Sequence, residues 1–482
     1  MKYALCRKGN SWMATPNIKR ILRPVLVLTA ALYTLALCAG CSRLPEVTLD
    51  QLMDQVNAAH QAVNNDGLIE KFIPRQPVDE NGELISESER FSYYVNTAEA
   101  DSYDPDLVLT RQQMEEDVVY LFDALYACYG NYDKMGGQAA FDAAEQAILE
   151  ECGQVDSLRA AEFQELLLSH LSFVKDAHFQ IQNQSPNPLW YPFFFREVAF
   201  YLDEDQYITA DHKKVASVDG YDDLTQLFKR SISPEGEIVY YPVVLQDTIT
   251  WDEPLIIHYT DGTAQVLQPE PYQEVPILNQ SAIPELRNNN GIPILQVNGM
   301  RNNSVPGWSE AFLEGAKTLG NSKIGILDLR FNSGGDQDLI ADWLKTYAKT
   351  SVPSNSLFLD AFTGEQMLNA RDLWVQNDNF LVILTSKHTA SGSEWLIDSA
   401  HNLENVLFVG ENTFGCLVGC SVAVHLKNSK FVAKIGTYEN IIPSTNDYFE
   451  EYRGFYPDLW VPADEAEDLV LALLARQAKD PA

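Results

Sequence analysis

The sequence is short of positive charge. Its 482 residues include 34 Lys and Arg against 68 Asp and Glu, which gives a formal net charge of −34 at pH 7. Six of the basic side chains lie in the first 40 residues, which hold no acidic residue, so the rest of the chain is still more acidic. Nucleic acids are bound mainly through Lys and Arg contacts to phosphates. We therefore expect no nucleic-acid partner.

The composition also lacks the bias of disordered or fibrous proteins. Hydrophobic residues make up 46% and charged residues 21% of the chain, enough for a packed core and, at this length, for roughly two to four domains. After residue 40 no apolar run reaches the length that spans a membrane. The seven Cys show no Cys/His spacing typical of a zinc site. No metal or cofactor is implied.

The N-terminus is cationic and resembles a targeting segment. Its Lys and Arg precede an apolar run over residues 24–37, the arrangement of a signal peptide. The run ends in Leu-Cys-Ala-Gly before Cys41, which resembles the lipobox of bacterial lipoproteins. The resemblance implies removal of residues 1–40, lipidation of Cys41 and an extracytoplasmic protein anchored to a bacterial membrane. An uncleaved signal anchor is the alternative.

The first half of the mature chain divides by its patterns into two parts. Residues 41–109 are expected to form a tether and an irregular segment, with a capping box at Thr48 that predicts one short helix. Residues 110–185 predict a small helical domain, because a second capping box at Thr110 opens a stretch with apolar residues three and four apart. Further helices are expected over 138–152 and 160–174.

Residues 186–290 change to short β-type runs separated by Asp and Gly turns. A strand and turn over Lys214–Gly220, followed by a helical stretch over Asp222–Lys229, resemble a PDZ-like module. A generic β-rich insert is the alternative.

Strands and helices alternate in residues 291–482. This alternation predicts an α/β core with a mixed sheet and flanking helices. Ligand sites in such sheets gather where the strands end, so the residues after Leu329, Thr385 and Val409 are examined first. Strands are expected over 292–297, 324–329, 380–385 and 406–409, and helices over 308–318, 337–348, 392–402 and from 463 onward.

Three motifs stand at these strand ends: DLRFNSGG over 328–335, TASGSE over 389–394 and GENTFG over 410–415. Together and in this order they resemble the core of the C-terminal processing and tricorn serine peptidases. The resemblance covers about residues 292–462. It implies a serine peptidase that forms an acyl-enzyme and acts on peptides or proteins.

Ser391 is the expected nucleophile. A Ser between a strand and a helix is presented at an exposed turn, where the helix N-terminus favours developing negative charge. The family pattern Ser-small-Ser-Glu places the nucleophile at the first Ser, with Ser393 and Ser304 as alternatives. The plain structural alternative is that Ser391 only caps the following helix.

Acyl transfer needs backbone N–H donors for the oxyanion. The resemblance assigns them to the glycine loop and to the residue after the nucleophile, hence to Gly334 or Gly335 together with Gly392. An ordinary strand-to-helix turn would also contain glycine.

The general base is expected to be a histidine. In the processing peptidases a Lys follows the Thr-Phe-Gly run, but Cys416 stands there in this chain. The tricorn-like branch instead uses an upstream His, and the sequence KDAHFQ places His178 in that position. Lys387, interpreted as a solvated loop cation, and His388 are alternatives, and His170 is interpreted as a packed residue.

The tricorn-like pattern also places an orienting carboxylate a few residues before a Gly-x-x-Pro-Asp run. That run is 454–458 here, and matching positions selects Glu451. Glu450 is the alternative, because neighbouring residues of a strand point to opposite faces.

The remaining cysteines could form disulfides in an oxidising exterior. Cys416 and Cys420 are expected to pair across a short loop at the rim of the site, with buried thiols as the alternative. Cys128 and Cys152 lie on separate predicted helices, and for them isolated thiols are as much expected as a disulfide.

The sequence thus predicts a membrane-tethered serine endopeptidase with Ser391, His178 and Glu451 as its catalytic residues. Two other readings stay open. A catalytically silent relative would bind peptides or apolar ligands in the same cleft, and an esterase-like hydrolase would use the same machinery. The oligomeric state is not predicted.

Overall fold

The computed structural model places the fold in the segment from Glu46 onward. The predicted signal peptide and Cys41 lie outside the described residues. Among the helices of the described part, none is both long and apolar enough to cross a bilayer. The structure describes residues 44–63, 77–79, 81–95, 103–274, 283–300, 305–360, 362, 374–417, 421–443 and 448–478.

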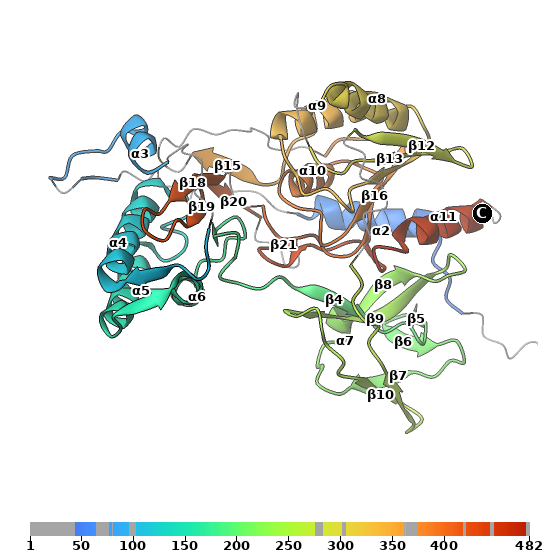
Figure 1. The fold of residues 1–482 in the computed structure, drawn as a ribbon. Coiled ribbons are helices and arrows are strands. Elements are labelled where there is room, and N and C mark those ends of the chain that lie inside the picture. Colours follow the sequence, from blue (N-terminus) through green and yellow to red (C-terminus); the bar gives the residue numbers. More distant parts are fainter. Residues whose placement is uncertain are drawn as a thin grey trace, which may run out of the picture. The chain divides into compact units, whose positions relative to one another are not determined.

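The centre of the fold is a six-stranded sheet in the order β12-β13-β14-β16-β17-β23. Figure 1 labels three of its strands, β12, β13 and β16. β12 pairs antiparallel with β13, and the other neighbours are parallel. The mixed α/β core predicted from the sequence is therefore confirmed. The strands are β12 (Glu285–Asn289), β13 (Ile292–Gln296), β14 (Ile324–Asp328), β16 (Phe380–Thr385), β17 (Val406–Gly410) and β23 (Leu459–Trp460).

Both faces of this sheet are buried, because its strands are apolar at successive positions. Neighbouring residues of a strand point to opposite faces. Leu327 and Ile383 pack in one cluster with residues of α8, α9 and α10, whereas Ile326 and Val382 pack in another with residues of α2 and α11. The helices are α2 (Leu49–Gln61), α8 (Trp308–Gly320), α9 (Gln337–Ala348), α10 (Gly392–Ala400) and α11 (Ala466–Gln477).

Helix α2 gives the predicted tether segment a structural role. The capping box expected at Thr48 is present, since its hydroxyl accepts from the Gln51 N–H at 3.2 Å and the Gln51 side chain accepts from the Thr48 N–H at 3.0 Å. Leu52 and Val56 are buried in the same cluster as Leu407 of β17. Burial of this apolar face attaches the N-terminal helix to the sheet.

The predicted helical part contains three helices and is completed by strands from far along the chain. Phe431 and Ile435 pack in the same core as Leu121 and Phe163. Strand β19 pairs antiparallel with both β18 and β3. The elements are α4 (Arg111–Cys128), α5 (Gly137–Gly153), α6 (Ala160–His170), β3 (Gln180–Ile181), β18 (Ser421–His425) and β19 (Val432–Gly436).

The β-rich part follows as expected, but the PDZ-like reading is not confirmed. The helix predicted over Asp222–Lys229 is only four residues long, and from Phe228 the chain forms a strand that pairs with β9. Pairing with a buried neighbour overrides the helical pattern here. The elements are β4 (Tyr191–Phe194), β5 (Phe200–Asp203), β6 (Gln206–Thr209), β7 (Val215–Val218), α7 (Leu224–Leu227), β8 (Phe228–Ile232), β9 (Ile238–Gln246), β10 (Leu255–Tyr259) and β11 (Ala264–Leu267).

The β12–β13 hairpin spans the expected boundary at residue 290, so the central sheet begins upstream of it. Short pairs of strands complete the structure: β1 with β2, β15 with β20, and β21 with β22. The remaining elements are α3 (Glu87–Tyr94), β1 (Val108–Thr110), β2 (Ser157–Arg159), β15 (Leu357–Asp360), β20 (Tyr438–Ile441), β21 (Phe449–Glu450) and β22 (Gly454–Phe455).

A buried histidine lies beside the sheet. The His401 ring stacks on Phe408 with centroids 4.4 Å apart, and its Nδ1 lies 2.8 Å from the Ile397 carbonyl. Burial, with a smaller effect of His60, lowers the pKa of His401 to about 3. Because the folded state holds this ring neutral, its contribution to stability is full above the ordinary histidine pKa and is lost as the pH falls toward 3.

We expect His401→Phe to flatten the acid limb of stability. Between pH 6.5 and 5 the unfolded chain binds a proton that the folded chain does not, which costs the wild type about 2 kcal/mol relative to the variant. Denaturant unfolding at the two pH values measures this difference. His170→Gln, at a partly exposed histidine, serves as the matched control, and equal pH dependence of all three proteins would refute the assignment.

Candidate active site

The site forms where β14, β16 and β17 end, as expected from their order in the sheet. Hydrogen bonds tie the loop after β14 to the turn after β16. The Asn332 carbonyl accepts from the Ala390 N–H at 3.0 Å and from the Ser393 hydroxyl at 2.9 Å. The Leu329 carbonyl accepts from the Thr389 hydroxyl at 2.9 Å. The glycine loop and the nucleophile turn therefore hold each other in place.

Ser391 sits on this turn in a strained conformation. Its φ of 52° and ψ of −115° lie outside the regions that non-glycine residues favour, which is typical of residues held in position at functional sites. The Ser391 N–H donates to the Glu394 carboxylate at 2.9 Å, and α10 begins at the next residue.

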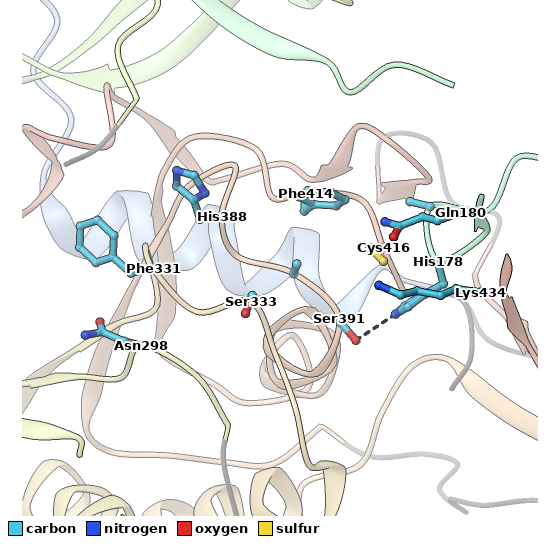
Figure 2. A pocket seen from close by; sticks show the side chains of 12 residues that line it. His178, Gln180, Asn298, Phe331, Ser333, His388, Ser391, Phe414, Cys416 and Lys434 are labelled. Carbon is cyan, nitrogen blue, oxygen red and sulfur yellow. Dashed lines mark hydrogen bonds between the residues drawn. The ribbon is translucent and has the colours of Figure 1, made fainter. Parts of the chain in front are cut away.

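The structure brings the predicted nucleophile and base together. Ser391 Oγ lies 3.1 Å from Nε2 of His178, although 213 residues separate them in the chain (Figure 2). This distance is within the reach needed for proton transfer between a nucleophile and its base. The contact distinguishes Ser391 from a residue whose hydroxyl only caps a helix.

The alternative nucleophiles lie elsewhere. The Ser393 side chain is buried, and its hydroxyl is used in the loop contact to Asn332. Ser304 lies outside the described residues.

The alternative histidines do not share the position of His178. His388 is exposed and lines another part of the same cavity (Figure 2). His170, expected to be packed, is partly exposed and lies 2.8 Å from the Glu151 carboxylate.

The expectation of a solvated Lys387 is wrong. Its side chain is only 3% exposed, and its Nζ donates to the carbonyls of Thr413, Phe414 and Tyr452 at 2.5, 3.2 and 3.4 Å. Burial lowers the pKa of Lys387 to about 7, against the opposing fields of Glu394 and Glu411. These contacts make the lysine a tie between two segments behind the nucleophile turn.

His178 is positioned by the chain on either side of it. The preceding Asp176 is buried, and its carboxylate accepts from the His178 N–H and the Tyr129 hydroxyl, both at 2.9 Å. After His178 the chain enters β3, where Gln180 pairs with Lys434 of β19. The imidazole therefore projects from a short segment that is fixed at both ends.

Glu451, the expected orienting carboxylate, lies next to this segment. It accepts from the N–H of Ala177 at 3.1 Å and from that of Leu417 at 3.2 Å. The alternative, Glu450, is exposed and forms an ion pair with Arg453 at 3.1 Å. Strand β21 ends at Glu450 and Glu451 lies in the turn that follows, where its side chain reaches the histidine segment.

Asp176, which is buried, and Glu451, which is half-buried, form a carboxyl pair beside the histidine. Burial raises the pKa of Asp176 to about 6. Burial and the nearby Asp176 charge together raise the pKa of Glu451. Two neighbouring carboxyl groups shielded from water are not readily ionised at the same time. The pair therefore favours a single negative charge near neutral pH.

The three candidate oxyanion glycines pack backbone against backbone. A Cβ on Gly334 would lie 2.5 Å from the Ala390 carbonyl oxygen, and one on Gly392 would lie 2.8 Å from the Gly335 nitrogen. Only glycine allows this approach.

Gly335 and Gly392 are the glycines whose N–H groups remain for an oxyanion. The Gly334 N–H donates to the Asn332 side chain at 2.9 Å, which removes the first of the two loop candidates. In the described part of the chain, no hydrogen bond takes up the N–H of Gly335 or of Gly392. Gly335 belongs to the glycine loop and Gly392 follows Ser391, and their backbones lie against each other.

Glu394 holds the nucleophile turn through hydrogen bonds, a role that was not predicted from the sequence. This buried carboxylate accepts from the N–H groups of Ser391, Gly415 and Cys416 at 2.9, 2.7 and 2.8 Å. The Thr413 hydroxyl donates to it at 2.5 Å. Its place three residues into a helix that follows a Ser was a signal for such a contact.

The expected disulfide between Cys416 and Cys420 is not supported. Cys416 is a free, buried thiol that packs with Ala177 and Tyr452, while Cys420 lies outside the described residues. Cys128 and Cys152 are buried thiols that form no disulfide. Burial raises the pKa of the Cys416 thiol, which makes it a poor nucleophile.

A cavity of about 720 Å³ opens over the Ser391–His178 pair. Its volume falls within the range of pockets that bind small ligands or short peptide segments. The apolar part of its wall is formed by Phe331, Ala390 and Phe414. The polar part is formed by Gln180, Asn298 and Lys434 (Figure 2).

Comparison with known families identifies this arrangement. Residues 291–461 match the model of peptidase family S41. This segment, which carries the Ser391 turn, is therefore similar to a family of peptidases. The predicted resemblance to C-terminal processing and tricorn peptidases is therefore confirmed over the segment that carries the nucleophile turn and glycine loop.

Several solved structures are similar to this chain. Mature CPAF is 12% identical, with 77% of this chain and 99% of that chain covered and a TM-score of 0.42. The photosystem II D1 C-terminal processing protease is 13% identical, with 73% and 93% covered and a TM-score of 0.35. Tricorn protease is 13% identical, with 76% and 37% covered and a TM-score of 0.34. None of the curated proteins matches the chain.

We expect Gly392→Ala to reduce kcat/KM for a fluorescence-quenched peptide by about 10²-fold, the effect of losing one oxyanion donor. The added Cβ would press on Gly335 and move both N–H groups. Gly153→Ala is the matched control, because a Cβ on this helical glycine would meet no atom within 4 Å. Wild-type kcat/KM in a folded Gly392→Ala protein would exclude these glycines from the oxyanion site.

Proposed function

We propose that this S41 peptidase is an endopeptidase that cleaves peptide bonds through an acyl-enzyme on Ser391, with His178 as the general base. The observation that carries the proposal is the 3.1 Å approach of His178 Nε2 to Ser391 Oγ. The two available N–H groups of Gly335 and Gly392 flank the same turn, so nucleophile, base and oxyanion donors converge on one point.

The first half of the reaction uses these groups together. His178 Nε2 takes the proton of the Ser391 hydroxyl as Oγ attacks the peptide carbonyl carbon. The carbonyl oxygen becomes negative and accepts hydrogen bonds from the N–H groups of Gly335 and Gly392. The partial positive charge at the N-terminus of α10 acts in the same direction.

The second half returns the proton. The His178 imidazolium donates it to the departing amine nitrogen, the C–N bond breaks, and the acyl group stays on Ser391. A water then takes the place of the amine and loses a proton to His178 as its oxygen attacks the acyl carbon. The bond between the acyl carbon and Ser391 Oγ breaks, His178 returns the proton to Oγ, and the acid product is released.

The carboxyl pair of Asp176 and Glu451 assists these proton transfers to and from His178. The single negative charge favoured on Asp176 and Glu451 lies beside the histidine segment and stabilises the imidazolium that forms in each half. Glu451 also fixes the segment by accepting from the Ala177 N–H. Its part is to orient and stabilise, whereas the bond-making groups are Ser391 and His178.

We also propose that the enzyme acts outside the cytoplasm, held to a bacterial membrane by a lipid on Cys41. The proposal is supported by the cationic leader, the apolar run and the Leu-Cys-Ala-Gly-Cys sequence that ends it. Incorporation of labelled palmitate into the wild type but not into a Cys41→Ala variant tests it. Equal labelling of both would refute the assignment.

We expect Ser391→Ala and His178→Ala each to lower kcat by about 10⁴-fold or more, because each removes a group that makes or breaks a bond. Glu451→Gln should keep a measurable remainder, about 10²–10⁴-fold below wild type, because nucleophile and base persist. Peptide hydrolysis under saturating substrate measures these losses.

Thermal unfolding supplies the control for these variants. The midpoint of Ser391→Ala should stay close to that of the wild type, since the change removes one oxygen at a half-buried position. An inactive Lys387→Ala beside an active His178→Ala would show that the activation chemistry is misassigned.

A further inference from the structure

The wall of the active-site cavity has the opposite charge balance to the rest of the protein. The chain has twice as many acidic as basic residues. Among the described residues that line the cavity there is no Asp or Glu, but there is Lys434. A lysine in a wall without carboxylates attracts anionic groups and disfavours cationic ones.

Lys434 is the permanent cation of this wall. It lies on β19 opposite Gln180 of β3, two residues after His178. Its Nζ donates to the Asn183 side-chain oxygen at 3.0 Å, an uncharged partner. In the described part of the chain no carboxylate forms an ion pair with it, so its charge is available to a ligand.

The position of Lys434 relative to the catalytic pair gives a direction along the substrate. His178 must reach both Ser391 Oγ and the departing amine, so the leaving group lies on the histidine side of the nucleophile. His178 and Lys434 lie on the same side of Ser391, while Phe331 and Asn298 lie on the other (Figure 2). Lys434 therefore faces the part of the peptide that follows the scissile bond.

We propose that Lys434 selects peptides that carry a carboxylate shortly after the scissile bond. This inference rests on the proposed function and adds its substrate class. The carboxylate comes from an Asp or Glu side chain or from a nearby free C-terminus, since both present the same anion to an ammonium group. Lys434 is a specificity-determining residue and takes no part in the bond-making steps.

The test begins with mapped cleavage of a peptide library. In the wild type, Asp, Glu or a free C-terminus should be enriched at the first positions after the cleaved bond. Lys434→Gln should abolish the enrichment, and Lys434→Glu should replace it with Lys and Arg. A wild type that cleaves without this enrichment, or a Lys434→Gln protein that retains it, would overturn the proposal.

Matched peptides then give the magnitude and identify the source of the carboxylate. One peptide places Asp after the cleaved bond, a second places Asn there, and a third has Asn with a free C-terminal acid in place of an amide. Lys434→Gln should reduce kcat/KM about tenfold for the preferred acidic peptide, the effect of one charge-assisted contact, and leave the neutral peptide nearly unchanged. Equal losses for all three peptides would mean a structural role.

Lys345→Gln is the matched control for charge. Lys345 is exposed on α9 and does not line the cavity. The substitution changes the net charge by the same amount as Lys434→Gln, so it reports any long-range field effect. The ratio of acidic to neutral kcat/KM should stay at the wild-type value, and a loss as large as that of Lys434→Gln would refute a local contact.

Binding separates this inference from the proposed chemistry. A Ser391→Ala protein should bind the acidic peptides about tenfold more tightly than the neutral one, and Ser391→Ala with Lys434→Gln should lose that preference. If the wild type cleaves nothing while this binding preference holds, the proposed peptidase activity fails and the carboxylate site stands. If Ser391→Ala binds acidic and neutral peptides equally, the carboxylate site fails.

Discussion

The pairing of β3 with β19 is the contact on which the candidate active site depends. Strand β3 begins two residues after His178. Strand β19 follows the segment 413–416, which is hydrogen-bonded to the Glu394 carboxylate. Ala433 and Ile435 of the same β19 pack in the helical core, so the histidine cannot shift without disturbing that core. The pairing thereby places His178 Nε2 3.1 Å from Ser391 Oγ, although the two residues are far apart in the sequence.

Buried polar groups fix the other half of the site. Glu394 and Lys387 lie behind the nucleophile turn and are both tied to the segment over 413–416. Buried charges are costly unless hydrogen bonds surround them, and these contacts supply such partners. These hydrogen bonds hold the turn that carries Ser391 from the side opposite the cavity.

The central sheet could be predicted because its signals are local. Apolar strands, periodic helices and the Thr48 capping box are visible in short windows, and the helix over 337–348 appears with the expected bounds. Lys387 and the helix expected at 222–229 were misjudged because distant contacts decide them: carbonyls of the 413–452 region bury the lysine, and β9 converts part of the helix into strand β8. The completion of the helical core by β18 and β19 has no local signal either.

The measurement that tests the central claim most directly is labelling with a fluorophosphonate followed by mass mapping of the modified residue. The account predicts one saturable adduct, located on Ser391, lost in Ser391→Ala and formed far more slowly in His178→Ala, because the hydroxyl then lacks its base. An adduct on another residue, or labelling of wild type and His178→Ala at the same rate, would contradict the account.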